Sequence, residues 1–371
     1  MLWLVFVASE KPMTLAPSLL IAVSKLSLVL VDGSKNRFNA LEYGNIIHFV
    51  FEKILKKYTT DELLDFSEEQ TLTAINDILG EYVRRNLGGW SDKTRRFKYL
   101  FERVASAAVP LVNHMANELA QSKFVPREFE LELSEEGGAK PLKLSLPDGS
   151  SIVVEGKVDR VDVMQHEGQS FVRVVDYKTG AKKFNLSDVL YGLNLQMLIY
   201  LEALWVSTPA KYGKIVPAGV LYLPSTSSAL SFDRDEDLAK LEKEKLRKLR
   251  MNGLLLDDLQ VIFGMERDAK GLYIPVVVKD EQPKSSESLA SVAELGAIMR
   301  HVNRLLVDMA VELREGDIAA RPAKGTYDAC EFCEYKAVCA PLRDENSRKV
   351  ESLKRDDFYE KLGLGGGEDN D

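Results

Sequence analysis

Cysteine is scarce in this chain of 371 residues: there are only three, and all of them fall between Cys330 and Cys339. A low and odd number excludes a disulfide framework and is typical of a reducing compartment. The sequence also lacks the GxxxxGK(S/T) phosphate-binding loop, so we expect no ATP hydrolysis by that route. The bunched cysteines are therefore a feature that the function has to explain.

Long apolar runs are absent as well. Residues 1–31 are rich in leucine and valine, but Glu10, Lys11 and Lys25 interrupt them below the ~18 apolar residues that a membrane span needs. No basic residue precedes Lys11, as a signal peptide would require, so we expect a cytoplasmic protein without a membrane partner. The net charge of -8 argues against coating nucleic acid by charge alone, but it allows a locally basic groove.

The spacing of apolar residues predicts helices first and strands afterwards. The expected helices cover residues 41–58, 61–87, 93–124 and 186–205, and the expected β runs cover 129–146, 152–163, 171–177 and 218–223. Tight polar turns join the first strands, so the sheet should begin antiparallel. The fold class is therefore α/β, with helices covering a sheet.

The C-terminal third has a different pattern. We expect a charged helix over 233–250, a linker at 285–288 and a long helix over 289–314 that ends near Gly316. The last stretch, 363–371, is Gly-rich and then acidic, which is typical of disorder.

An acid and a lysine stand together at the end of an apolar strand, in Asp176-Tyr177-Lys178. Side chains two apart on a strand share a face, so the two point the same way. The carboxylate suits a hard cation such as Mg²⁺, and the ammonium can orient an attacking water and offset phosphate charge. Taken alone, the D-x-K pattern is more common as a solvated ion pair.

The preceding strand supplies further carboxylates, Asp159 and Asp162. They are three residues apart and so lie on opposite faces, which lets only one of them face the same site as Asp176. Asp159 shares its face with valines, whereas Asp162 shares its face with Arg160 and could pair with solvent. The alternative for each carboxylate is a surface charge or a hairpin salt bridge.

Two helices add polar residues to this set. His48 follows Gly44 by one turn at the edge of an apolar face; imidazole can ligate a metal, and the glycine leaves room for close approach. Gln196 and Tyr200 share one face of the helix after the D-x-K strand. A structural histidine and ordinary polar packing are the alternatives for these residues.

These motifs together resemble the RecB-type branch of the PD-(D/E)XK nuclease superfamily, whose core is α-β-β-β-α-β with a mixed sheet. They are Gly44-x-x-x-His48, Gly156-x-x-Asp159, Asp176-x-Lys178 and Gln196-x-x-x-Tyr200, in this order. The resemblance implies metal ligands and catalytic residues. The ligands would be His48, Asp159, Asp176 and the Tyr177 carbonyl, with Lys178 as the catalytic lysine and Gln196 and Tyr200 at the active site or on DNA. Asp162 matches no required ligand.

From about Asn36 to Arg343 the chain further resembles the nuclease region of the AddB family, the second subunits of bacterial AddAB helicase–nucleases. The matching segments include 122–124, 219–222, 251–254 and the cysteine cluster. The resemblance implies a Mg²⁺- or Mn²⁺-dependent deoxyribonuclease that acts as an exonuclease on single strands at DNA ends. It also implies an AddA-type helicase subunit as partner and a role in recombinational DNA repair. The basic stretch from Lys240 to Arg250 is a candidate DNA contact, or else a solvated helix face.

The cysteines are spaced as Cys330-x2-Cys333-x5-Cys339, which suits zinc or an iron–sulfur cluster. In the related iron–sulfur nucleases, three such ligands combine with a distant cysteine before the glycine–histidine helix to hold a 4Fe-4S cluster. This chain has no cysteine there. We interpret residues 1–35 as an unmatched segment that is non-native or read in another frame.

The expected division of the chain has five parts. They are the unmatched segment 1–35, the helical lead-in and nuclease core 36–225, a charged helical insertion 226–288, the long helix and iron–sulfur segment 289–343, and a partly disordered tail 344–371. Two alternatives to an active helicase–nuclease part remain open. One is a catalytically silent fragment that binds a DNA end or a partner, and the other is a stand-alone CRISPR-associated RecB-like nuclease.

Overall fold

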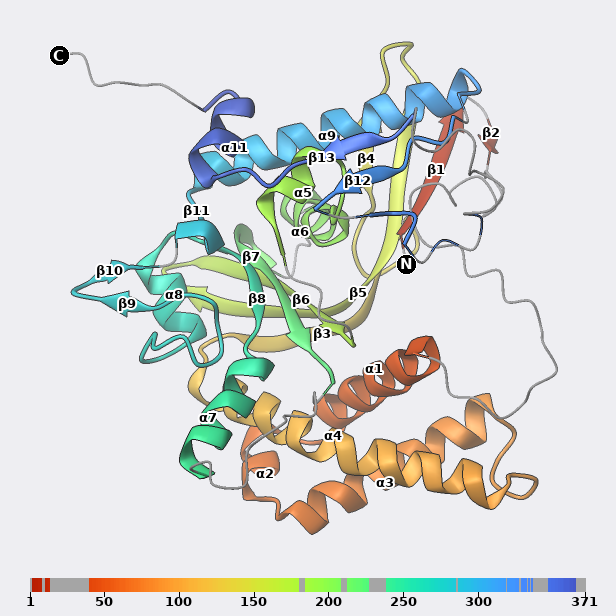
Figure 1. The fold of residues 1–371 in the computed structure, drawn as a ribbon, viewed down its shortest axis with the longest axis vertical. Coiled ribbons are helices and arrows are strands. Elements are labelled where there is room, and N and C mark those ends of the chain that lie inside the picture. The colour runs from red at the N-terminus through yellow and green to blue at the C-terminus, as the bar shows by residue number, and fades with distance from the viewer. Residues whose placement is uncertain are drawn as a thin grey trace.

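The computed structural model describes residues 2–8, 11–13, 40–179, 184–207, 212–226, 238–284, 286–317, 319–326, 328–331, 333, 335 and 346–364. A sheet runs through the middle of the molecule, and helices lie on both sides of it (Figure 1). This arrangement confirms the α/β class.

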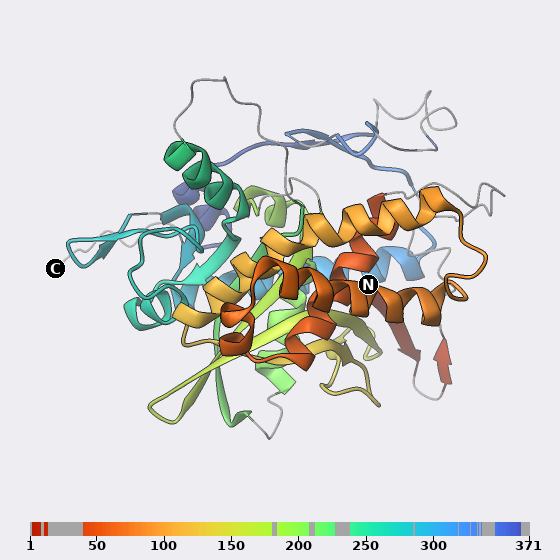
Figure 2. The same ribbon diagram turned by 90° about the horizontal axis from the view of Figure 1, so that it is seen from below.

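Four helices cover one side of the sheet, and seen from below they form one layer across it (Figure 2). They are α1 (Ala40–Lys57), α2 (Thr60–Asp65), α3 (Glu68–Asn86) and α4 (Arg95–Gln121). The expected single helix over 61–87 was wrong, because it is divided at Phe66, which has extended backbone. Ser67 then starts α3 with a capping box to Gln70.

In the described part of the chain, nine strands form one mixed sheet. They are β1 (Leu2–Ala8), β2 (Lys11–Met13), β3 (Val125–Leu133), β4 (Leu142–Ser145), β5 (Ser151–His166), β6 (Gln169–Lys178), β7 (Lys214–Pro224), β8 (Asn252–Leu256) and β11 (Leu289–Ala290). β5 and β6 form an antiparallel hairpin, as expected, and β6 and β7 are parallel. The chain therefore crosses over between β6 and β7, which requires intervening helices.

Strand β5 pairs with four neighbours. β3 pairs with it over 156–163 and β4 over 151–154, both along one edge. On the other edge, β1 pairs with 151–156 and β6 with 160–166. Residues 157–159 therefore face no paired strand on that edge, among the strands that the structure describes.

The crossover helices lie on the other side of the sheet. They are α5 (Leu186–Leu190) and α6 (Gln196–Ser207), with α9 (Val292–Arg314) and α11 (Arg355–Lys361) outside them (Figure 1). Every residue of α6 from Met197 to Leu204 is buried, because the sheet and α9 pack on opposite sides of it.

Two expected helices differ from the structure. The helix over 186–205 is broken at 191–195, where Gly192 has a φ of +77° and Asn194 donates a hydrogen bond to Asp188 over 2.5 Å. The helix over 289–314 begins only at Val292, because β11 pairs with β8 and Ser291 then caps α9.

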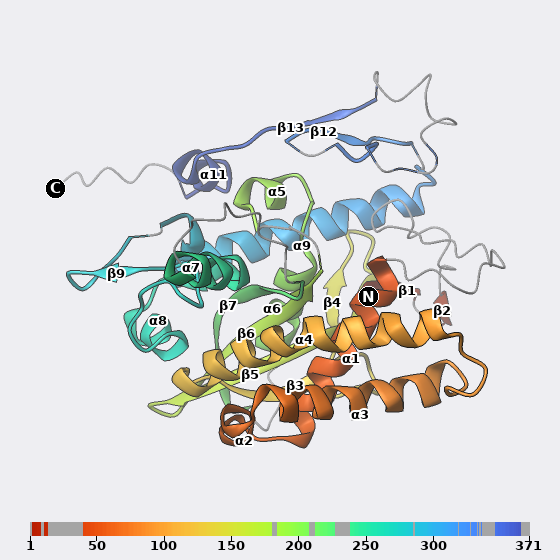
Figure 3. The same ribbon diagram turned by 60° about the horizontal axis from the view of Figure 1, so that its bottom comes forward.

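The remaining described elements are short. They are α7 (Leu238–Leu249), α8 (Leu259–Met265), β9 (Val278–Lys279), β10 (Gln282–Pro283), η3 (Ser286–Ser288), β12 (Ala323–Gly325) and β13 (Arg348–Val350). Figure 3 shows β12, β13 and α11 along the outer side of α9. Residues 233–237 of the expected charged helix and 365–371 of the expected tail lie outside the described residues. Among the described helices, none has the length and apolar character needed to cross a bilayer.

Strands β7 and β8 approach closely at two glycines. A Cβ atom on Gly253 would lie 2.0 Å from Val220 O, and one on Gly219 would lie 2.4 Å from Leu254 O. Their φ angles, +159° and +149°, are also unfavourable for residues with a side chain. The β7–β8 pairing therefore requires glycine at both positions.

Candidate active site

A row of polar side chains crosses the sheet where β5 and β6 separate. Their ladder ends at the Arg160–Val175 pair, so Asp159 and Asp176 are the next residues on the two strands. Opposed residues of antiparallel strands share a face, which places both carboxylates on one side of the sheet. Tyr222 of β7 pairs with Asp176 and continues the row.

The separation of the strands is held by Asp159 itself. Its Oδ2 accepts a hydrogen bond from the Tyr177 backbone N–H over 3.0 Å. The side chain thus takes the place of the carbonyl that a continued ladder would have used. The β6 backbone stays tied to β5 at this point, and the Tyr177 carbonyl is directed to the side of α1, where His48 contacts it.

Asp176 and Lys178 form an ion pair, with Lys178 Nζ 2.5 Å from Asp176 Oδ2. Asp176 is only 4% exposed. Burial, and next the charge of Asp159, raise the pKa of Asp176 to about 6, although Lys178 acts in the opposite direction. Two largely buried carboxylates that share one lysine make a site with a deficit of positive charge.

His48 projects from α1 into this region. Its Nε2 donates a hydrogen bond to the Tyr177 carbonyl over 2.9 Å, and its Nδ1 lies 3.3 Å from Asp159 Oδ2. Burial alone would lower the pKa of His48, but Asp159 and the Tyr177 carbonyl outweigh it and raise the pKa. Conversely, burial would raise the pKa of Asp159, but the contacts with His48 and Tyr177 lower it.

The residues brought together fit a divalent cation. His48 nitrogen, the Asp159 and Asp176 carboxylates and the Tyr177 carbonyl supply one nitrogen and several hard oxygen ligands, a set typical of Mg²⁺ or Mn²⁺ sites. The repulsion that raises the pKa of Asp176 is the interaction that a cation between the carboxylates would relieve. Donor atoms of His48, Asp159 and Glu130 also lie within 4.8 Å of one another.

Gln196 and Tyr200 adjoin the site from α6. Gln196 Nε2 donates a hydrogen bond to the Tyr200 hydroxyl over 3.0 Å. Tyr200 is 1% exposed, and burial is the main cause that raises its pKa to about 12; the charges of Asp159 and Asp176 act in the same direction. Tyr200 therefore holds the half-buried Gln196 in place, and Gln196 is the member of the pair with surface to offer.

Gly44 lies one turn before His48 and faces the residue after Lys178. A Cβ atom on Gly44 would lie 3.6 Å from Thr179 Cγ2, which is an ordinary contact distance. The packing of α1 on β6 therefore does not itself require a glycine here.

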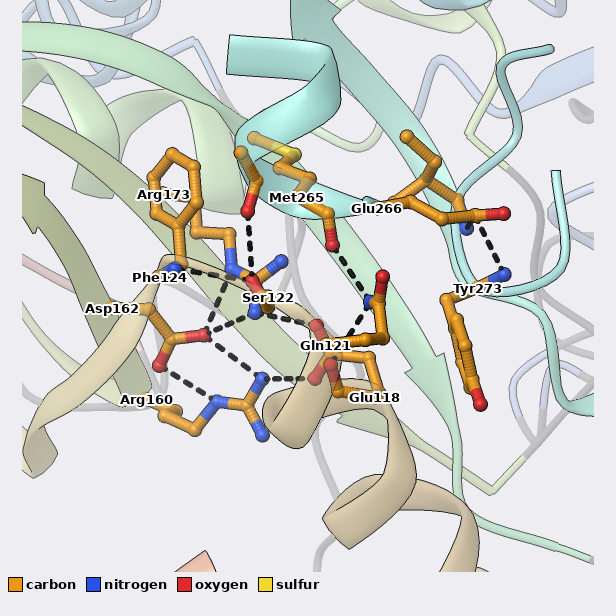
Figure 4. A network of polar contacts seen from close by, with 12 residues as sticks. Glu118, Gln121, Ser122, Phe124, Arg160, Asp162, Arg173, Met265, Glu266 and Tyr273 are labelled. Carbon is orange, nitrogen blue, oxygen red and sulfur yellow. Dashed lines mark hydrogen bonds and ion pairs between the residues drawn. The ribbon is translucent and has the colours of Figure 1, made fainter. Parts of the chain in front are cut away.

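Asp162 is not a solvated charge, and the expectation that it could pair with solvent was wrong. It is fully buried on the face opposite Asp159, in a network with Arg160, Arg173 and Glu118 (Figure 4). Arg160 Nε lies 2.9 Å from Asp162 Oδ1, and Arg173 Nε donates to Asp162 Oδ2 over 2.8 Å. Glu118 of α4 accepts a hydrogen bond from Arg173 over 2.7 Å. Two acids and two arginines neutralise each other, which is the condition for burying such charges.

The end of α4 extends this network toward the insertion. Gln121 Nε2 donates to Met265 O over 3.0 Å, and its Oε1 accepts from Arg267 N over 2.7 Å (Figure 4). The guanidinium of Arg173 also stacks on Phe124, 5.0 Å from the ring centroid. The helical layer, the hairpin and α8 are thus joined at one point beneath the candidate site.

Sequence reasoning missed Glu118, Arg173 and Glu130. Glu118 stands in an otherwise apolar stretch of α4, and a charge on a buried helix face is a signal of a buried partner. Arg173 interrupts a run of valines on β6 in the same way. Glu130 had no such signal, because it belongs to the alternation that predicted the strand.

The cysteine cluster lies only partly within the described residues. Cys330 is buried and Cys333 is exposed, whereas Cys339 lies outside the described residues. In the proposed basic strip, Lys245, Arg247 and Lys248 of α7 are exposed.

Comparison with known proteins agrees with this geometry. A family model described as the PD-(D/E)XK nuclease superfamily matches residues 25–340. The chain therefore belongs to the PD-(D/E)XK nuclease superfamily.

Relatives with an established name point in the same direction. The chain is 28% identical over 332 residues to the B subunit of the ATP-dependent helicase/deoxyribonuclease of Alkaliphilus metalliredigens, covering 86% of this chain and 29% of that protein. It is 30% identical over 326 residues to the protein of the same name from Acetivibrio thermocellus, covering 85% of this chain and 28% of the relative. The corresponding protein of Ruminiclostridium cellulolyticum is 30% identical over 338 residues, which cover 88% of this chain and 29% of the relative. This chain spans less than a third of the length of these relatives.

Proposed function

We propose that the chain is a Mg²⁺- or Mn²⁺-dependent deoxyribonuclease that hydrolyses phosphodiester bonds of single strands at DNA ends. We further propose that it acts in the cytoplasm as the nuclease part of an AddAB-type helicase–nuclease, together with an AddA-type helicase subunit, in recombinational repair of breaks. The observation that carries the proposal is the meeting of Asp159, Asp176 and Lys178 at the point where β5 and β6 separate.

The proposed cation would be held by His48, Asp159, Asp176 and the Tyr177 carbonyl. When bound, a divalent cation supplies positive charge to the phosphate and makes water a stronger acid. In the hydrolysis, a water oxygen forms a bond to phosphorus, the bond to the leaving oxygen breaks, and a proton passes to that oxygen.

The side chains of this chain have distinct parts in that reaction. Lys178 is held by Asp176, and since an ammonium carries three N–H donors it can also contact a phosphate oxygen or the attacking water. Tyr177 N–H and His48 fix the orientation of the Asp159 carboxylate. Tyr200 fixes Gln196, whose amide can contact the substrate. The exposed basic residues Lys245, Arg247 and Lys248 are a proposed contact for the DNA backbone.

A 4Fe-4S cluster is a separate matter. Four cysteine thiolates are the usual ligands of such a cluster, and the sequence contains three cysteines. The chain by itself does not complete that ligand set, so no step of the proposed reaction depends on a cluster. Iron and sulfide analysis of anaerobically purified protein, compared with a Cys330→Ser variant, measures whether the three cysteines hold one.

The test of the nuclease proposal uses a control that the chain itself provides. Asp268 and Lys270 have the same D-x-K spacing and form an ion pair over 2.8 Å, but both are exposed. We expect Asp176→Asn and Lys178→Ala to lose Mg²⁺-dependent cleavage of end-labelled single-stranded DNA, whereas Asp268→Asn and Lys270→Ala keep it. Circular dichroism and thermal unfolding check that all four variants are folded.

The opposite outcome favours the second candidate, a catalytically silent module that binds DNA ends or a partner. It is supported if the folded wild-type chain binds DNA ends but cleaves nothing with Mg²⁺ or Mn²⁺, alone and with a helicase partner. Cleavage that survives intact in both Asp176→Asn and Lys178→Ala would overturn the site assignment.

A further inference from the structure

We propose that Glu130 is a further carboxylate of this site and helps to hold the divalent cation, together with Asp159 and His48. This inference rests on the proposed function, since it concerns the same metal site. A carboxylate oxygen of Glu130, one of Asp159 and a ring nitrogen of His48 all lie within 4.8 Å of one another. The residues come from three separate elements, β3, β5 and α1.

The strand register explains why Glu130 reaches the site. Phe129 pairs with Arg160 and Leu131 with Val158, so Glu130 stands directly opposite Asp159. Opposed residues on antiparallel strands share a face, with Cβ atoms roughly 5 Å apart. Together with Asp176 and Tyr222, Glu130 therefore completes a row that crosses four strands, β3, β5, β6 and β7.

Two like charges directly opposite each other destabilise a sheet unless something compensates them. Lys157 pairs with Glu130 over 2.9 Å, and its own side chain is 44% exposed. His48 lies against Asp159 instead. Each carboxylate thus has its own cationic neighbour on its outer side, and the space between them is the position that a shared cation would neutralise.

The backbone at Glu130 adds an independent observation. Its φ is +52°, in the left-handed region, which is uncommon for a residue other than glycine and especially so within a strand. Such strain is found at functional sites, where the surrounding structure holds it in place. Neighbouring Glu132 is exposed and does not share this backbone conformation, so the distortion is specific to the residue that faces Asp159.

The chemistry of this set is that of a hard or borderline divalent ion. Two carboxylates with one imidazole suit Mn²⁺ and Mg²⁺ better than they suit soft, thiophilic ions. With Asp176 on the opposite side of Asp159, the Asp159 carboxylate stands between two acidic neighbours and can contribute to both halves of the site.

The test measures metal binding without DNA and without turnover. Mn²⁺ is titrated calorimetrically into the full chain as wild type, Glu130→Gln and Glu132→Gln. Glu132 is the matched control, because it lies two residues along the same strand and pairs in register with Lys157. We expect Glu130→Gln to weaken Mn²⁺ affinity at least tenfold and Glu132→Gln to leave it within twofold.

A second variant keeps the proposal testable if Glu130→Gln does not fold. Lys157→Met removes the competing partner of Glu130 but keeps the carboxylate, so Mn²⁺ affinity should stay the same or rise. A fall in affinity in Lys157→Met, or wild-type affinity in a folded Glu130→Gln, would overturn the role of Glu130. If the wild type binds Mn²⁺ and cleaves DNA in those cases, the proposed function stands; if the wild type does neither, the proposed function fails itself.

Discussion

The Tyr177 backbone N–H donates its hydrogen bond to the Asp159 side chain rather than to a β5 carbonyl, over 3.0 Å. This one bond lets β6 leave the β5 ladder while both strands remain connected. It also fixes the carboxylate that the proposed metal site needs most, because Asp159 lies between His48 and Asp176.

This relationship predicts different results for two substitutions of Asp159. Asp159→Asn keeps an oxygen that can accept the Tyr177 N–H, so stability should stay within about 1 kcal/mol of wild type. Cleavage and Mn²⁺ binding should nevertheless fall at least about a hundredfold, because the charge is lost. Asp159→Ala should lose activity and also about 1–3 kcal/mol of unfolding free energy, since it leaves a backbone donor unpaired. Urea unfolding and a nuclease assay separate the two effects, and wild-type activity in Asp159→Asn would contradict the prediction.

The buried network predicts a large loss of stability without any change at the metal ligands. Asp162→Ala leaves Arg160 and Arg173 buried without their shared partner, which should cost about 3–5 kcal/mol. The control is Asp148→Ala, which removes an exposed ion pair with Arg314 and should cost less than about 1 kcal/mol. Chemical denaturation of both variants gives the comparison; equal stabilities would contradict the network's importance.

A third prediction concerns pH. Burial raises the pKa of Glu202 on α6 to about 7, although a hydrogen bond from Asn303 on α9 acts against it. The folded state therefore resists ionisation that the unfolded chain undergoes above pH 4.5, and stability from this group is full at low pH and falls as the pH rises toward 7. Glu202→Gln should remove that fall. Its unfolding free energy relative to wild type should increase by about 3 kcal/mol between about pH 4.5 and about pH 8.

The measurement is a series of denaturant titrations across that pH range for both proteins. A difference between Glu202→Gln and wild type that does not change with pH would show that Glu202 titrates normally. Comparing the difference, rather than each curve, removes the contributions of the other titrating groups.

The fourth prediction tests the close approach of β7 and β8. Gly253→Ala places a methyl group 2.0 Å from Val220 O, so the strands must move apart and stability should fall by more than about 3 kcal/mol. Gly149 also has a positive φ, +84°, but its Cβ position is open, so Gly149→Ala should cost only about 1 kcal/mol. Thermal unfolding of both variants distinguishes steric contact from backbone strain.

The sequence allowed the fold class and the proposed site to be predicted because their signals are local. Period-two alternation and the D-x-K pair at a strand end depend only on neighbouring residues. Glu130 could not be found in that way, because its meeting with Asp159 depends on the register between two separate strands, β3 and β5. The pairing of Glu118 with Arg173 spans 55 residues and has no local pattern either.

The errors in element boundaries have a similar origin. Hydrophobic periodicity continues across residues 186–205 because both α5 and α6 are buried, whereas the break between them depends on the left-handed Gly192. For Asp162, face alternation correctly placed it away from Asp159. It could not reveal that a helix covers that face and turns a surface position into a buried one.

The burial of α6 on all sides limits how small a working nuclease could be made from this chain. Val302, Leu306 and Ala310 of α9 are buried in the same core as α6, and Asn303 donates a hydrogen bond to Glu202 over 2.6 Å. A protein cut before residue 292 would leave the outer surface of α6 uncovered, together with an unpaired acid. Because α6 also carries Gln196 and Tyr200, any attempt to isolate a minimal catalytic piece has to retain α9, although α9 contributes no residue to the row of acids.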